Sequence, residues 1–179
     1  MARPRKIDRA QLLDLAEEII AAAGPSALSF GSLATHADIP KATVQSVFGT
    51  REALIDEMLA RWTTKEQERF DCTLSGSTAQ RDHITAHIRT TADEAPDESS
   101  RIATLLAALA RSGEQSAAAV RWYQSRIGNL SATTDEDRRL RIAFLAAEGI
   151  FYLRHLIGFP VSEELWRDIF DDLLEFASE

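Results

Sequence analysis

The sequence lacks a cysteine pair, a secretory leader and any long hydrophobic run. Its single cysteine, Cys72, leaves the 179-residue chain without an internal disulfide framework. Residues 1–6 contain no apolar stretch of the kind that begins a secretory signal. No apolar run reaches the roughly 18–20 residues that cross a bilayer, because the most apolar stretch, residues 142–159, is broken by Glu148, Arg154 and His155. These absences predict a cytoplasmic protein that does not associate with a membrane.

Strand patterns, phosphate-binding glycine loops and catalytic constellations are lacking as well. The four histidines follow no metal-ligand pattern. His83 and His87 share a helical face at i and i+4, but the glutamate of the zinc-protease motif is missing between them. We therefore expect no metal, no cofactor and no catalytic residue. A rival hypothesis, an enzyme that uses these two histidines in a helical pocket, stays open at this point.

Helical periodicity is what the sequence has almost throughout, since apolar residues recur every three or four positions. Asp8, Asp135 and Ser162 are the expected N-caps of the first, eighth and last helices, and Gly24-Pro25 is expected to end the first one. The fold class predicted is all-α. The predicted helices cover 8–23, 30–37, 41–48, 51–70, 79–94, 98–111, 115–130, 136–158 and 163–177.

Charge is distributed unevenly between the two ends of the chain. The net charge of −8 at first argues against nucleic-acid binding. Residues 1–51, however, hold six basic and five acidic side chains, a balance of +1, so the remainder carries −9. This pattern favours a DNA-binding tip on an acidic body. The alternative is that Arg3, Arg5 and Lys6 belong to a solvated tail.

The last two predicted helices carry more apolar surface than one small chain readily covers. The helix at 163–177 has one continuous apolar stripe, whereas the helix at 136–158 is apolar on two faces, which predicts burial on both sides. A second copy packing across a two-fold axis would supply the missing cover. The sequence leaves open which face of the 136–158 helix lines a pocket and which meets the partner. The interface residues we predict are Phe151, Tyr152, His155, Trp166, Phe170, Leu173 and Leu174.

An ordered set of residues runs from Leu12 to Leu59 without gaps. An alanine-bearing helix ends at a glycine, a serine opens the next helix, and a threonine in a short third helix is followed by Phe and then Arg-Glu. The residues are Ala16, Gly24, Ser29, Leu33, Ala34, Ala37, Ile39, Thr43, Phe48, Arg51, Glu52 and Leu54. This order and spacing resembles the DNA-binding head of the TetR family of repressors. The resemblance implies a three-helix helix-turn-helix head, here residues 1–51, on a helical-bundle body that binds a ligand and dimerises, here residues 52–179.

Four positions depart from the family pattern. Asp38 replaces the usual turn glycine, and aspartate is among the few residues that tolerate the left-handed conformation. Pro40 replaces a capping serine, Gln45 replaces a frequent tyrosine, and Arg51 replaces a lysine. The departures bear on operator identity and DNA affinity more than on the fold. They also keep open a rival hypothesis, an interaction protein that has the fold but has lost specific DNA binding.

The resemblance implies two sets of functional residues and three partners: a palindromic double-stranded operator, a small-molecule effector and a second copy of the chain. The third helix would enter the major groove while a basic arm reaches the minor groove. The DNA-binding residues predicted are Arg3, Arg5, Lys6, Ser29, Lys41, Ala42, Thr43, Gln45, Ser46 and Arg51. The ligand-binding residues predicted are Trp62, Phe70, His87, Leu105, Leu109, Trp122, Tyr123, Phe144 and Glu148. For the body residues, plain core packing is the alternative.

Overall fold

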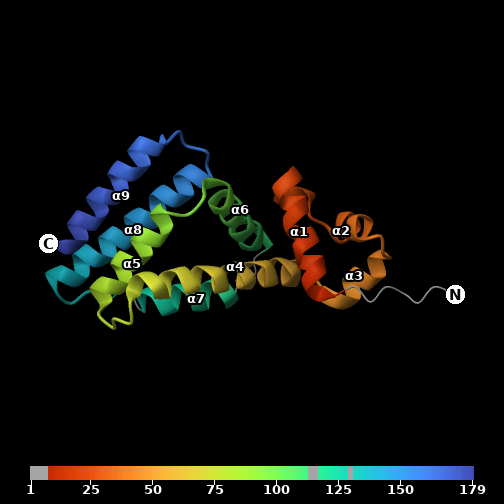
Figure 1. Cartoon of the computed structure of the whole chain (residues 1–179), viewed down its shortest axis with the longest axis horizontal. Helices are drawn as coiled ribbons and strands as arrows, with labels where there is room; N and C mark the ends of the chain where they lie inside the picture. Colours follow the sequence, from red (N-terminus) through yellow and green to blue (C-terminus); the bar gives the residue numbers. More distant parts are fainter. Residues whose placement is uncertain (1–7, 113–116, 129–130) are drawn as a thin grey trace.

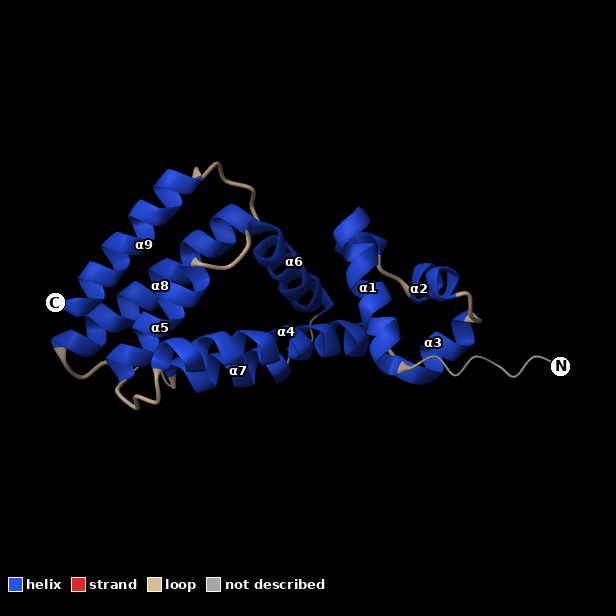
Figure 2. Ribbon diagram, in the orientation of Figure 1, coloured by secondary structure: helices blue, strands red, loops and turns tan. Residues whose placement is uncertain are grey.

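The computed structural model describes residues 8–112, 117–128 and 131–179, and every regular element in these ranges is helical (Figure 2). A short 3-10 turn at Pro25–Ala27 follows the first helix. The α-helices are α1 Arg9–Ala23, α2 Phe30–Ala37, α3 Lys41–Phe48, α4 Arg51–Leu74, α5 Gln80–Ala92, α6 Pro96–Ser112, α7 Ala117–Ile127, α8 Asp135–His155 and α9 Glu163–Ser178. The all-α prediction is confirmed.

Helices α1, α2 and α3 form a compact tip at one end of the molecule (Figure 1). The Ser29 side chain accepts from the Ser32 backbone, and Ser32 returns the bond in a capping box that begins α2. Asp38 takes the left-handed conformation, with φ of 53°, between α2 and α3. Pro40 stands at the N-cap of α3 without a side-chain cap. The tight turn predicted at Asp38 and Pro40 is therefore confirmed.

The core of this head extends beyond its three helices. Leu12 and Ile19 of α1 and Leu33 of α2 pack in one buried cluster with the first turns of α4. Ile102 and Leu105, which lie far along the chain in α6, belong to the same cluster. In Figure 1, α4 runs from the head into the body and α6 approaches α1. The head therefore shares its core with two helices of the body.

A second buried cluster holds the body together at the opposite end. It joins α5, α8 and α9 through residues such as Ile88, Phe144 and Phe170. In Figure 1, α8 and α9 lie far from α2 and α3. None of the described helices is long and apolar enough to span a membrane.

Several helix ends differ from the prediction; α5, for example, ends at Ala92 rather than at residue 94, and α8 ends at His155 rather than at residue 158. Helix α4 continues to Leu74 rather than Phe70, because the break comes only where Ser75 takes the left-handed conformation, with φ of 52°. Thr134, and not Asp135, is the N-cap of α8, and Asp137 completes a capping box with it. Three backbone and side-chain donors of Thr133 and Thr134 bind the Asp137 carboxylate, and these bonds lower its pKa to about 2. The N-caps predicted at Asp8 and Ser162 are confirmed.

The predicted interface residues need a correction. Phe151, Trp166 and Phe170 are buried in the core of the chain itself, so they have almost no surface left to lose to a partner. His155 and Tyr152 are half-buried, and His155 packs on the Trp166 ring. The prediction was wrong for the three buried aromatics because the apolar stripe of α9 that carries two of them faces α5 and α8 within the same chain. Leu173 and Leu174 are half-buried and stay predictions.

Candidate functional sites

The exposed side of α3 is the first candidate site. Lys41, Ala42, Thr43, Gln45 and Ser46 are all exposed. Val44 and Phe48 of the same helix are buried and anchor it to the head. The helix thus presents short polar arms and a lysine to solvent while its apolar side fixes its orientation. An exposed helix of this kind fits the width of a major groove, about 12 Å.

The residues flanking α3 have structural roles as well. Ser29 is exposed at the start of α2, where its hydroxyl takes part in the capping box. Nε of Arg51 donates to the Leu28 carbonyl at 3.0 Å, which ties the start of α4 to the loop before α2. A role for either residue at a DNA phosphate stays a prediction. Arg3, Arg5 and Lys6 lie outside the described residues.

An inner pocket lies in the body between α4, α5, α6, α7 and α8. Its volume is only about 20 Å³. The residues that line it are Trp62, Glu66, Thr91, Glu94, Ile102, Leu106, Trp122, Tyr123, Glu148 and Phe151. Apolar and aromatic walls with a few polar groups are typical of small-molecule sites. The indole N–H of Trp122 is buried without a hydrogen-bond acceptor from the described residues, an exception to the usual pairing of buried polar atoms.

Glu148 is the centre of a hydrogen-bond network on one wall of the inner pocket. Its Oε1 lies 2.9 Å from Nε2 of His87, and its Oε2 accepts from the Tyr123 hydroxyl at 2.5 Å. The Tyr152 hydroxyl is 3.5 Å from that of Tyr123. Burial, and then the charge of Glu148, raise the pKa of Tyr123, so the phenol remains protonated and acts as a donor. The network links α5, α7 and α8.

Arg126 is a buried cation next to Glu66 that lies between two aromatic rings. The guanidinium carbon of Arg126 is 3.9 Å from the centroid of the Phe70 ring and 4.4 Å from that of Trp122. Its Nη2 donates to the Glu66 carbonyl at 2.8 Å. Burial lowers the pKa of Arg126 to about 10, which still leaves it charged at neutral pH. Glu66 pairs with Arg69 at 2.5 Å.

Glu94 is the third carboxylate of the inner pocket and lies in the loop between α5 and α6. Nε1 of Trp62 donates to its Oε1 at 2.8 Å, and the Ser99 hydroxyl lies 3.3 Å from its Oε2. Only 8% of the residue is exposed. Burial, and then the nearby charge of Glu66, raise the pKa of Glu94 to about 7. Its protonation therefore changes within the physiological range.

The structure brings together four of the predicted ligand-binding residues: Trp62, Trp122, Tyr123 and Glu148. His87 and Phe144 lie behind them, where their rings pack at 5.0 Å. Phe70 and Leu105 do not line the inner pocket: Phe70 lies under Arg126, and Leu105 belongs to the head core. The side chain of Leu109 lies outside what the structure describes.

The sequence analysis missed Glu66 and Glu94. Glu66 could have been found, because it stands four residues after Trp62 and four before Phe70, on the apolar stripe of α4. A charged residue on a buried stripe marks either an ion pair or a site. Glu94 follows the end of α5 in a loop, where no periodic pattern distinguishes a buried carboxylate from an exposed one.

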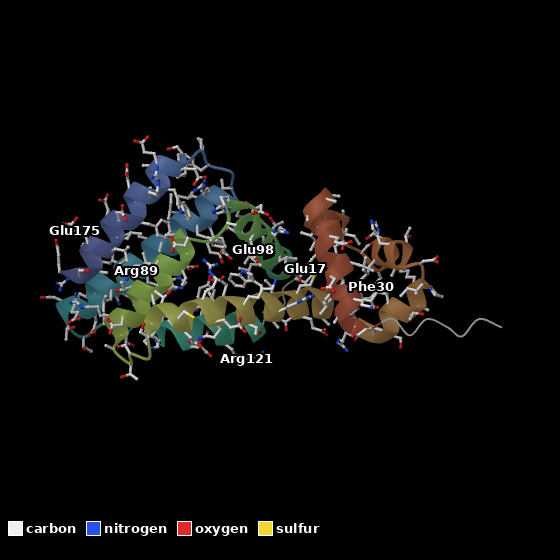
Figure 3. The ribbon with its side chains drawn as sticks, in the orientation of Figure 1. Glu17, Phe30, Arg89, Glu98, Arg121 and Glu175 are labelled. Carbon is white, nitrogen blue, oxygen red and sulfur yellow. The ribbon has the colours of Figure 1, made fainter. Side chains whose placement is uncertain are left out.

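A second cavity, the junction cavity, lies where α1 of the head meets α4 and α6. Its volume is about 280 Å³. Glu17 of α1 and Glu98 of α6 face each other across this junction (Figure 3). The remaining lining residues are Ile20, Met58, Trp62, Lys65, Arg101, Ile102 and Leu105. Trp62 and Ile102 line both cavities, so they form the wall between them.

The outer side of α8 and the segment after it form an exposed apolar face. The exposed fractions of its large side chains run from 39% at Leu156 to 70% at Ile157. The residues of this face are Ile142, Leu145, Ala146, Gly149, Leu153, Leu156 and Ile157. A contiguous apolar surface of this kind marks an interaction site. This is the other of the two apolar faces recognised in the sequence.

Comparison with known proteins agrees with these features. The model of the tetracyclin repressor-like C-terminal domain matches residues 81–178, more than half of the chain. No curated protein matches the chain. The chain belongs to the TetR family of transcriptional regulators.

Solved structures of one protein have the same fold. The multidrug binding protein EbrR in complex with imidazole superposes with a TM-score of 0.68 at 22% identity, over 94% of this chain and 96% of that one. The complex with ethidium gives 0.60 at 23% identity, over 92% and 97%. The complex with proflavin gives 0.59 at 21% identity, over 92% and 98%. At this level of identity the likeness concerns the fold.

Proposed function

We propose that this protein is a homodimeric repressor that binds a palindromic operator through α3 and leaves it when a small organic molecule occupies the body. The observation that carries the proposal is the fully exposed polar side of α3 on a head whose core includes α4 and α6. A DNA-reading element is thereby joined directly to the helices that line the inner pocket.

The exposed polar arms of α3 have the chemistry of base and phosphate contacts. Gln45 can form two hydrogen bonds with adenine, and Thr43 can contact either a base or a thymine methyl group. Lys41 lies at the first turn of α3, where backbone N–H groups also favour a phosphate. Ser46, Ala42, Ser29 and Arg51 complete the proposed contact surface.

Dimerisation would use the exposed apolar face of α8 together with the half-buried Leu173 and Leu174 of α9. A two-fold axis brings the same face of both copies together, and Leu165 of α9 adds 44% exposed apolar surface beside it. Two heads must lie about 34–36 Å apart to meet successive major grooves. A ligand that binds more tightly to a dimer with another spacing between the heads lowers DNA affinity. The size of this decrease is limited by the ratio of the ligand's affinities for the two dimer states.

A small organic ligand in the body is supported by the chemistry of the inner pocket. Three indole and phenol rings and three carboxylates converge there from α4, α7, α8 and the loop before α6. The protein EbrR, which has the same fold, was crystallised with imidazole, proflavin and ethidium. A helical body of this shape can therefore hold flat organic molecules.

The DNA-binding proposal is tested with Thr43→Ala and Gln45→Ala in titrations against the upstream DNA of the protein's own gene. Each substitution is expected to weaken specific binding by about 1–3 kcal/mol, because each removes a base-edge contact. Lys41→Ala is expected to weaken binding to all sequences and to reduce its salt dependence.

Arg138→Ala is the matched control, since it removes an exposed positive charge on α8, far from the head. It should leave DNA affinity unchanged. Wild-type protein that binds no DNA even at low salt would contradict the proposal. That result would favour a fold-retaining interaction protein instead.

A further inference from the structure

The inner pocket is too small for an organic molecule while Trp62 stands in its present position. Its volume of about 20 Å³ holds little more than one water molecule. The junction cavity on the other side of Trp62 and Ile102 is more than ten times larger, at about 280 Å³. If the indole of Trp62 turns aside, the two volumes join. The joined cavity is then continuous from the head–body junction to Glu148.

Trp62 packs on the edge of the head core and donates one side-chain hydrogen bond. This hydrogen bond runs from Nε1 to the Glu94 carboxylate at 2.8 Å, and the indole packs against Trp122 with ring centroids 5.1 Å apart. The residue is only half-buried, and one side of it faces the junction cavity. Rotation of the indole would break the bond to Glu94 and leave that carboxylate facing the opened pocket.

The charges around the pocket do not balance when Glu94 is ionised. Glu66 has Arg69 at 2.5 Å and Arg126 nearby, and Glu148 has His87 and Tyr123 as hydrogen-bond partners. Glu94 forms no ion pair in the part of the chain that the structure describes. A buried carboxylate without a cation is costly. Its raised pKa, about 7, reflects that cost.

We propose that Trp62 is a gate, and that the pocket it closes receives a flat aromatic monocation whose charge is balanced by Glu94. This inference deepens the proposed function, because it takes the inner pocket to be the effector site. Trp122, Tyr123 and Phe151 supply aromatic faces for a planar ring. A cation over such faces gains about 0.5–2 kcal/mol, most when it is desolvated.

Cation binding must then compete with the proton on Glu94. The groups that face this carboxylate are Glu66 and Arg69 on α4, His87 on α5 through Glu148, Glu98 on α6, Arg126 on α7 and Glu148 on α8. With the pKa of Glu94 at about 7, the ionised fraction falls roughly tenfold from pH 8 to pH 6. Affinity for a monocation should fall by the same factor, and one proton should be released for each ligand bound at pH 6.

The test uses the full chain and a pair of ligands that differ in charge but not in shape, N-methylisoquinolinium and 2-methylnaphthalene. Calorimetric titration at pH 8 should show at least tenfold tighter binding of the cation. Glu94→Gln keeps an acceptor for the Trp62 indole but removes the charge. It should weaken the binding of N-methylisoquinolinium at least tenfold, abolish the pH dependence of that binding, and leave the binding of 2-methylnaphthalene unchanged.

Glu68→Gln is the matched control, because it removes an exposed carboxylate of α4 that lines neither the inner pocket nor the junction cavity. It should change cation affinity less than twofold. Equal losses in the two variants would mean that the acidic surface attracts the cation without a specific site, and would overturn the assignment of Glu94. Unchanged DNA affinity of the ligand-free Glu94→Gln protein shows that the variant is folded.

Trp62→Phe tests the gate. Phenylalanine keeps an aromatic ring but lacks the N–H that binds Glu94, so the closed state loses its hydrogen bond. Cation affinity should rise about threefold to tenfold. Unchanged or weaker binding would overturn the gating role of Trp62.

The outcomes separate this inference from the proposed function. A cation that binds through Glu94 but leaves the operator complex intact supports the inference and contradicts ligand-induced release. A protein that binds its operator and releases it with 2-methylnaphthalene, while Glu94→Gln changes nothing, supports the proposed function and overturns the inference.

Discussion

At the scale of single residues, buried polar groups set the chemistry of the body. Glu94 is one of them, and its hydrogen bonds come from the neutral groups of Trp62 and Ser99. Arg126 is another: it is only 1% exposed and lies between two rings near Glu66, and its Nε and Nη1 have no hydrogen-bond acceptor among the described residues. Buried ionisable groups without a full set of partners are concentrated at functional sites. Glu94 therefore links stability to ligand binding.

Glu94→Gln is expected to stabilise the ligand-free protein at pH 8. The pKa of Glu94 is raised from 4.5 to about 7, so the folded state holds the proton more tightly than the unfolded state does. Stability from this group is fully present below pH 4.5 and is lost as the pH rises to about 7. Glutamine avoids the loss and should raise the free energy of unfolding by about 1–3 kcal/mol at pH 8.

Urea unfolding at pH 8 and at pH 4.5 measures this effect. Most of the gain should disappear at the lower pH, where Glu94 is protonated in the folded state and half protonated in the unfolded state. Glu98→Gln, whose carboxylate is half-buried, should show no comparable gain at either pH. A gain of equal size at both pH values would contradict the explanation, since it could not come from ionisation.

Single residues of this kind were the hardest to predict from the sequence. Asp38 was predicted correctly because its role is local: a turn between two short helices needs a left-handed residue, and Asp38 has φ of 53°. Glu94 depends on Trp62, which is 32 positions away, and on Glu66, both brought near by packing. No local pattern carries that information.

At the scale of elements, the helices could be predicted because caps and periodicity are local. Helices α2 and α3 have the predicted bounds, and Asp8 and Ser162 cap α1 and α9 as expected. The orientation of α8 could not be predicted in the same way. Both of its faces are apolar, and only the packing of α5 and α9 decides which one is buried.

The exposed apolar face of α8 gives a prediction about assembly. Leu145 lies in the middle of this face and is 50% exposed. Leu145→Glu places a charge at a two-fold interface, so each dimer buries two glutamates, one from each copy. The dimer dissociation constant should rise at least 100-fold, about 2.7 kcal/mol. Sedimentation velocity across a concentration series measures it.

Val120→Glu is the matched control, because Val120 is 43% exposed but lies on α7, away from the face of α8. This variant should sediment as the wild type does. Dissociation by Val120→Glu with an intact Leu145→Glu dimer would move the interface to α7.

At the scale of the whole molecule, the head and α6 share one buried core. Ile102 and Leu105 pack with Leu12 and Leu33 in the head cluster. Ile102 also lines the inner pocket and the junction cavity. A ligand that displaces α6 must therefore disturb the packing of the head. Packed cores have discrete arrangements, so a small shift at the pocket is passed on rather than absorbed.

Ile102→Ala is expected to uncouple ligand from DNA. Binding energies are reciprocal: the factor by which the ligand weakens DNA affinity equals the factor by which DNA weakens ligand affinity. Such factors are commonly about 5–150. The smaller side chain loosens the contact between α6 and the head, so both factors should fall together by several-fold. The ratio of ligand affinities measured with and without DNA, and the ratio of DNA affinities measured with and without ligand, separate the coupling from any direct effect of the substitution on the pocket.

Leu140→Ala is the control at this scale. Leu140 is as buried as Ile102 but belongs to the second cluster of the body. Both truncations should cost about 2–5 kcal/mol of stability. Only Ile102→Ala should lower the coupling factor, as measured by DNA titrations with and without ligand and by ligand titrations with and without DNA. An unchanged factor in Ile102→Ala would show that α4 alone carries the signal, since α4 is the other helix that belongs to both the head core and the pocket wall.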